Sequence, residues 1–145
     1  MVLVRPRRLR GVLAGLLFVM ALAGCEWSSP ATPTLAVVPS DLRVIDGDTI
    51  SWRGERIRLV GYDTPEIFSP RCAAELQKGH AARRLLAGMI AGARSAGLVV
   101  SYERDRYGRA LAVLVLDSAD VGPRLVAAGL ARPYGSGRRS SWCGA

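Results

Sequence analysis

Three short segments in which apolar and polar residues alternate constrain the fold of this chain most strongly. They are residues 42–45, 50–52 and 56–60, with turn-forming sequences at 46–48 and 53–55 between them. A period of two is typical of strands that bury one face, and Asp-Gly or Arg-Gly steps are typical of tight turns. The stretch therefore predicts three consecutive β-strands joined by short turns.

The rest of the chain predicts one long helix followed by a return to strands. Residues 69–93 are rich in alanine, with large apolar residues at helical spacing, and 121–128 form a shorter helical segment. Residues 98–103, 109–116 and 131–134 have strand composition, and the second of these is nearly all apolar, so we expect it to be central. This order predicts an α+β, mainly β domain: a five-stranded OB-type Greek-key barrel with one long and one short helix.

The N-terminus has the pattern of an export signal. Basic residues at the start precede an apolar run at 11–22, which is shorter than the roughly 20 residues needed to span a bilayer. The run ends in a sequence that closes with Cys25 and resembles the lipobox of bacterial lipoproteins, in which the cysteine is acylated. We therefore expect a signal peptide at 1–24 and an extracytoplasmic protein, lipid-anchored to the bacterial cell envelope through Cys25. An ordinary signal peptide with a chance cysteine is the alternative.

The remaining chain divides into a tether and one domain. Residues 25–40 are rich in proline and serine and predict an extended tether, so the folded domain is expected at 41–145. Half of the 145 residues are hydrophobic, which suits one modest core and argues against disorder. The formal charge of +8 suits a polyanionic partner without requiring one.

Two cysteines remain within the predicted domain, Cys72 and Cys143. Cysteines outside the reducing cytoplasm usually pair, so we expect a disulfide between them. The spacing alone does not show that their backbones approach closely enough, and two free thiols are the alternative.

Carboxylates and arginines gather in two short stretches of the domain. The first runs from residue 46 to 66 and the second from 105 to 109. Carboxylates bind hard cations through oxygen, and arginines bind phosphate through two parallel hydrogen bonds. The composition therefore predicts a metal-assisted phosphodiester site. Each stretch alone is weak, because Asp-Gly is a common turn, Thr-Pro-Glu a common helix start, and Arg-Tyr-Gly-Arg a possible solvated hairpin tip.

Taken together, the motifs DGDT, R-x4-D-T-P-E and D-R-Y-G-R resemble the staphylococcal nuclease (thermonuclease-like) family. The resemblance covers roughly residues 42–134 and includes the helix between the second and third motifs. It implies an OB-fold enzyme that hydrolyses DNA and RNA with calcium. No feature of the sequence points to an obligate protein partner.

The resemblance also implies roles for individual residues. Ca²⁺ would be held by carboxylates of Asp48 and Asp63 and the backbone carbonyl of Thr64, with Asp46 at the rim. Glu66 would be the general base toward water, and Arg58 and Arg109 would hold the scissile phosphate. By the same resemblance, three residues would lie near the bound nucleotide: Arg106, Tyr107 and Tyr134.

Two other functions remain open from the sequence. One is a non-catalytic OB-type nucleic-acid-binding lipoprotein, which would need aromatic stacking platforms in a chain that is only 6% aromatic. The other is a structural envelope lipoprotein on a degenerate nuclease fold. Every motif position that the chemistry needs is filled, which favours the enzyme over both.

Overall fold

The computed structural model describes residues 34–135 and 137–144. The predicted signal peptide, the predicted acylation site Cys25 and the first part of the predicted tether lie outside these residues. In the described part of the chain, no helix is long and apolar enough to cross a bilayer.

The first three predicted strands form an antiparallel meander. They are β2 (Leu42–Val44), β3 (Thr49–Trp52) and β4 (Glu55–Leu59), paired in sequence order. The turn between β3 and β4 has positive φ at both central residues, 51° at Arg53 and 84° at Gly54. A two-residue turn of this kind matches the twist of the flanking strands, which is why a glycine follows the arginine here.

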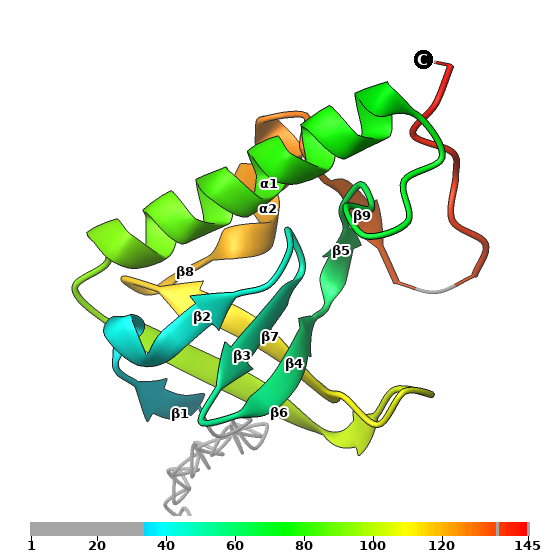
Figure 1. Cartoon of the computed structure of the whole chain (residues 1–145). Helices are drawn as coiled ribbons and strands as arrows, with labels where there is room; N and C mark the ends of the chain where they lie inside the picture. Colours follow the sequence, from blue (N-terminus) through cyan, green and yellow to red (C-terminus); the bar gives the residue numbers. More distant parts are fainter. Residues whose placement is uncertain (1–33, 136, 145) are drawn as a thin grey trace, which may run out of the picture. The chain divides into compact units, whose positions relative to one another are not determined.

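A second hairpin completes the main sheet. β6 (Ala96–Arg104) and β7 (Ala110–Leu116) pair antiparallel, and β7 also pairs with β4 in parallel. β7 is thus central, as its apolar sequence predicted. The short β8 (Ala119–Asp120) pairs with β7, and the path through the sheet is β1-β6-β7-β4-β3-β2. The result is a curved half-barrel (Figure 1).

The start of the domain was predicted too late in the chain. β1 (Thr34–Val37) falls within the expected tether, yet it pairs with β6 and forms the edge of the sheet. The prolines at 33 and 39 flank this strand rather than interrupt it, and an edge strand tolerates prolines at its ends. A short 3₁₀ turn, Pro39–Asp41, then leads into β2.

A separate pair of strands extends beyond the main sheet. β5 (Gly61–Asp63) follows β4 after a single residue and pairs antiparallel with β9 (Arg132–Tyr134), the predicted last strand. The α+β, mainly β class with one long and one short helix is confirmed. The sequence did not predict β1, β5 or β8, which have two to four residues and no clear alternation of apolar and polar side chains.

Both helices begin at side-chain caps. The sulfur of Cys72 accepts the backbone N–H of Glu75 at the start of α1 (Ala73–Gly92), and the Asp120 carboxylate accepts the N–H of Gly122 at the start of α2 (Val121–Ala127). The predicted starts and ends agree within a few residues, the usual uncertainty of such boundaries.

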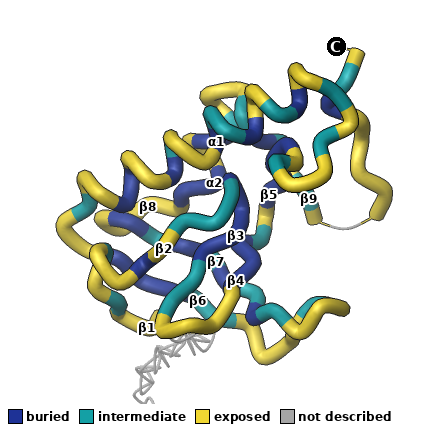
Figure 2. The backbone as a smooth tube through the Cα atoms, in the orientation of Figure 1, coloured by how far each residue is buried: buried dark blue, intermediate teal, exposed yellow. Residues whose placement is uncertain are grey.

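The core lies between the helices and the sheet (Figure 2). Its most deeply buried side chains come from the meander, β5, the second hairpin and both helices: Ile50, Leu59, Tyr62, Leu86, Leu98, Leu114, Val121 and Leu125. Both helices therefore add apolar surface to one face of the sheet, which is the main stabilising term for a domain of this size.

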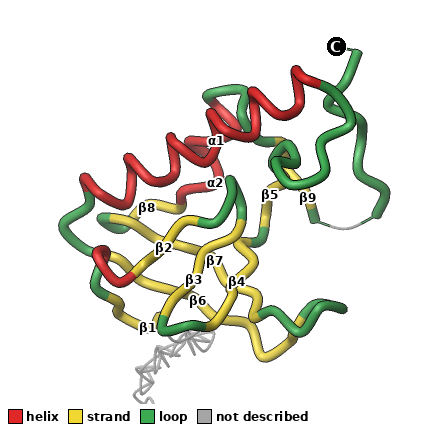
Figure 3. The backbone as a smooth tube through the Cα atoms, viewed as in Figure 1, coloured by secondary structure: helices red, strands yellow, loops and turns green. Residues whose placement is uncertain are grey.

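The tail after β9 is attached to the start of α1. Cys72 and Cys143, the pair predicted from the sequence, form a disulfide with their Cα atoms 6.0 Å apart. Trp142 is buried beside it, and the Arg132 guanidinium lies 3.5 Å from the centre of its indole ring. Figure 3 shows the tail next to the loop that precedes α1.

We expect this disulfide to stabilise the domain substantially. It joins residues 71 positions apart, and the chain-entropy treatment of such a loop gives about 4 kcal/mol. Adding reductant should lower the free energy of unfolding by about 2–4 kcal/mol, measured by urea unfolding. A Cys143→Ser variant should be less stable and indifferent to reductant; equal urea midpoints for reduced and oxidised wild type would contradict the expectation.

Candidate functional site

The turn between β2 and β3 presents the first pair of acids. The backbone N–H groups of Ile45 and Asp46 both donate to the Thr49 carbonyl, at 2.9 and 3.2 Å, and Asp46 Oδ1 accepts the N–H of Asp48. The Asp48 carbonyl accepts the N–H of Leu59 at the end of β4. The turn is therefore fixed at both ends and to the neighbouring strand.

A carboxylate connects this turn to the second acidic stretch. Asp48 Oδ2 accepts hydrogen bonds from the Thr64 backbone N–H at 3.1 Å and from Thr64 Oγ1 at 3.0 Å. Gly47 lets the two segments approach, because a Cβ there would lie 2.7 Å from Thr64 Oγ1 and 2.8 Å from the Cβ of Ala82. The sequence predicted Gly47 only as a turn former and missed this packing role.

Arg58 lies buried among both acidic stretches. Its guanidinium forms an ion pair with Asp48 Oδ1, lies 3.5 Å from Asp63 Oδ1, and donates to the carbonyls of Asp48 and Tyr62. Burial lowers the pKa of Arg58, and the positive charge of Arg139 lowers it further. The carboxylates of Asp48 and Asp63, both predicted to bind metal, thus contact the same buried guanidinium, that of Arg58.

The carboxylate of Asp63 is the least satisfied polar group of the site. It is 5% exposed, and its Oδ1 accepts no hydrogen bond from the described residues. Two guanidiniums face it nonetheless: the Nε of Arg139 lies 3.0 Å away, and Arg58 is on the other side. Those contacts lack hydrogen-bond geometry, so this buried oxygen keeps lone pairs available for another partner.

Asp46 and Glu66 line a pocket of about 410 Å³, the first pocket of the site, whose wall also includes Asp48 and Arg58. Glu66 is exposed, and its Oε1 accepts the N–H groups of the next two residues at 2.9 and 3.0 Å. Burial raises the pKa of Asp46, and the Glu66 charge adds to this, although Thr49 and Arg58 oppose it. The two carboxylates are therefore close enough to repel.

The tip of the second hairpin orients Arg109. Asp105 accepts the N–H of Arg109 at 2.9 Å through Oδ1 and its Nε at 2.7 Å through Oδ2, and Arg109 Nη1 lies 3.4 Å from Thr49 Oγ1. Partial burial raises the pKa of Asp105, but the hydrogen bonds from Arg109 and Tyr107 outweigh it, and the pKa lies below its usual value. Asp105 therefore holds this arginine, a role that the sequence pattern did not predict.

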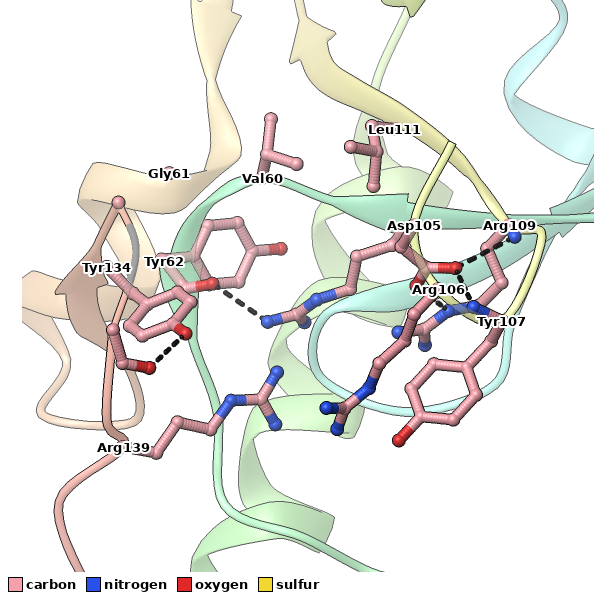
Figure 4. A pocket seen from close by; sticks show the side chains of 13 residues that line it. Val60, Gly61, Tyr62, Asp105, Arg106, Tyr107, Arg109, Leu111, Tyr134 and Arg139 are labelled. Atoms are coloured by element: carbon pink, nitrogen blue, oxygen red, sulfur yellow. Dashed lines mark hydrogen bonds and ion pairs between the residues drawn. The ribbon is translucent and has the colours of Figure 1, made fainter. Parts of the chain in front are cut away.

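A second pocket, of about 570 Å³, adjoins the first and shares Arg58 and Arg109 with it (Figure 4). Tyr134 lines it and donates its hydroxyl to the Gly137 carbonyl at 2.8 Å. Arg106 lies 4.8 Å from the ring centre of Tyr107. All predicted substrate-binding residues therefore line this second pocket.

The structure brings the predicted site residues into these two connected pockets and the neighbouring wall. Asp48, Thr64, Glu66, Arg58 and Arg109 line the first pocket, and Asp63 is not part of its lining but contacts Arg58. Residues that the sequence analysis did not assign to the site also line it or support it: Gly47, Tyr62, Asp105 and Arg139.

A hard cation is the kind of ligand that this donor set fits. Aspartate carboxylates and a threonine segment supply oxygen only, and Asp63 Oδ1 is buried without a hydrogen bond. Elsewhere in the described residues, Cys72, Glu75 and Cys143 place three ligand atoms within 4.8 Å of one another, but both sulfurs belong to the disulfide and are not thiolates.

Carboxylate oxygens and arginines are the residue types that suit hard cations and phosphates, and they line the same pocket of this half-barrel. The family model described as "Staphylococcal nuclease homologue" matches residues 56–141, more than half of the chain, and the chain belongs to this family. The resemblance drawn from the motifs is thereby confirmed at the level of the family.

Two relatives show the same similarity. The chain is 37% identical to the thermonuclease of Staphylococcus intermedius over 97 residues, which cover 62% of this chain and 55% of the relative. It is 33% identical to the thermonuclease of Staphylococcus hyicus over 95 residues, 63% of this chain and 56% of the relative. The chain thus spans little more than half the length of these relatives.

The close packing at Gly47 makes a specific prediction. Gly47→Ala should lower the free energy of unfolding by about 1–3 kcal/mol, because the new methyl group overlaps Thr64 and Ala82. Gly88→Ala is the matched control: no atom lies within 4 Å of the place on α1 that its new methyl group would occupy, so it should be neutral or stabilising by up to about 1 kcal/mol. Denaturant unfolding measures both, and equal stability of the two variants would rule out the proposed crowding.

Proposed function

We propose that this protein is a calcium-dependent nuclease that hydrolyses phosphodiester bonds of DNA and RNA by in-line attack of water. The observation that carries the proposal is that buried Asp48 lines one pocket together with Arg58 and Arg109, while buried Asp63 contacts the same Arg58 guanidinium. Such a site matches the charge that develops on a phosphodiester during attack, and electrostatic complementarity of this kind is usually the largest catalytic term.

Asp48, Asp63 and the Thr64 carbonyl would hold the cation. Calcium takes six to eight oxygen ligands, so water would complete the shell around these groups. When bound, the cation supplies positive charge toward the phosphodiester oxygens. Asp48 is already oriented by the hydrogen bonds from Thr64, which reduces the reorganisation that binding requires.

Arg58 and Arg109 would bind the oxygens of the scissile phosphate. Arg109 is oriented by Asp105, which uses its Nε and leaves terminal nitrogens for a ligand. Arg58 is held in place by burial and by two backbone carbonyls. Both guanidiniums are therefore preorganised, and a planar fork binds phosphate oxygens in pairs.

Glu66 would accept the proton of the attacking water. Its carboxylate lines the first pocket at the solvent side, and one oxygen already accepts two backbone N–H groups. Those bonds restrain the side chain while the second oxygen remains available. A general base needs both reach to the water and a fixed orientation.

The metal assignment is tested with Asp63→Asn, which keeps the shape of the side chain. We expect calcium binding, measured by isothermal titration calorimetry, to be lost and calcium-dependent cleavage of DNA to fall by at least about a hundredfold. Asp41→Asn removes an equal charge from the exposed 3₁₀ turn and should behave as wild type. The assignment would be refuted if Asp63→Asn cleaved DNA in calcium as fast as wild type and if a chelator abolished that cleavage. Binding of a labelled strand without cleavage by wild type would favour the non-catalytic module.

We also propose that the mature protein is lipid-anchored to the cell envelope through Cys25. The support is the sequence pattern at the N-terminus, in which the cysteine follows small residues at the end of an apolar run. Cys25→Ser should abolish incorporation of labelled palmitate and release the protein from membranes. Equal labelling of the variant and the wild type would contradict the anchor.

A further inference from the structure

The tail segment that carries Arg139 forms one wall of the site. Arg139 lines both pockets described above, and its Nε lies 3.0 Å from Asp63 Oδ1. Figure 4 shows the Arg139 and Arg106 side chains extending toward the middle of the second pocket from different sides. Arg139 is far from the nuclease motifs in the sequence, yet it lies in the same site as their carboxylates and arginines.

Contacts on both sides of Arg139 hold it there. Before it, the Tyr134 hydroxyl donates to the Gly137 carbonyl at 2.8 Å. After it, the Ser141 carbonyl accepts a bond of 2.7 Å from the Arg132 guanidinium, which also covers Trp142. The disulfide at Cys143 then closes the tail onto α1. The backbone around Arg139 is therefore anchored although the segment is exposed.

The guanidinium of Arg139 has donors to spare. Its Nε faces Asp63, and among the described residues no hydrogen bond uses its terminal nitrogens. About half of the side chain, 52%, is exposed to solvent. An arginine carries five N–H donors, so this one can contact Asp63 and a phosphate at the same time.

The surroundings favour an anion at this position. Arg139, Arg58, Arg106 and Arg109 all line the second pocket, against one acid there, Asp105, that is already bonded to Arg109. A concave surface lined mainly by positive charges concentrates the electrostatic field and attracts a polyanion. A polynucleotide that enters the first pocket would pass this wall.

We propose that Arg139 is a substrate-binding residue that contacts a phosphate of the polynucleotide, and that the disulfide-anchored tail holds Arg139 in position for this contact. This inference rests on the proposed nuclease function for the identity of the substrate. The ion pair with Asp63 keeps the guanidinium in the pocket before substrate binds, so little side-chain freedom is lost on binding.

The first test measures binding without cleavage. A fluorescently labelled single-stranded DNA oligonucleotide is titrated with the protein in excess chelator, and anisotropy gives the Kd. Arg139→Ala should raise the Kd about tenfold, the effect of one charge-assisted hydrogen-bonded contact, whereas Arg138→Ala should change it by about twofold or less. Arg138 is the matched control because it is the exposed neighbouring residue and carries the same charge. Equal Kd values for the two variants would overturn the proposal.

A lysine variant and a calcium titration separate substrate contact from damage to the cation site. Arg139→Lys should recover part of the affinity, since it keeps the charge and loses the planar fork. Calcium affinity of Arg139→Ala, by calorimetry, should be unchanged or higher, because a competing positive charge beside Asp63 is removed. Weaker calcium binding by this variant would mean that Arg139 acts on the metal site, and would overturn the assignment.

A double-mutant cycle tests whether the disulfide-anchored tail holds Arg139 in position. In a Cys143→Ser background, checked for folding by circular dichroism, Arg139→Ala should lose most of its effect on the oligonucleotide Kd, because the arginine is no longer held in place. A full tenfold effect in that background would refute the role of the disulfide. Failure of the wild type to cleave DNA in calcium would defeat the proposed nuclease function, while the binding comparison would still decide the role of Arg139.

Discussion

The buried guanidinium of Arg58 between Asp48 and Asp63 is the interaction on which the site depends. A charge removed from water is costly unless partners surround it, and here two carboxylates and two backbone carbonyls do so. The requirement ties β4 to the turn before β3 and to β5, which together carry Asp46, Asp48 and Asp63. The groups that a cation and a phosphate would need are therefore ordered before either arrives.

The pairing of β4 with β7 explains how the two motif arginines come together. This parallel contact aligns Ile57 with Ala110 and Arg58 with Leu111, so that the end of the second hairpin meets the meander beside Arg58. Asp105 then turns Arg109 toward Thr49. Strand register, set by which apolar faces are buried, thus positions Arg109 at the hairpin tip beside the meander.

The tail connects stability to the site. A segment rich in glycine, serine and arginine has little apolar surface with which to dock, and Trp142 is its one buried large side chain among the residues that the structure describes. The disulfide and the stacked Arg132 compensate for this. The same tail that the disulfide joins to α1 carries Arg139 to within 3.0 Å of Asp63, so the covalent link and the charge placement belong to one segment.

The sequence by itself determined the strands with clear alternation, both helices, and the residue types of the site, because these follow from local period, capping and chemistry. It did not determine β1, whose few residues lie between prolines, nor the shared burial of Asp48, Asp63 and Arg58. It also did not place Arg139 beside Asp63. β1 and β6, like Arg139 and Asp63, are distant in the chain, and only the tertiary packing of the sheet and the anchored tail brings them together. The groups around Arg58 are closer in sequence, but their burial depends on how the strands pack.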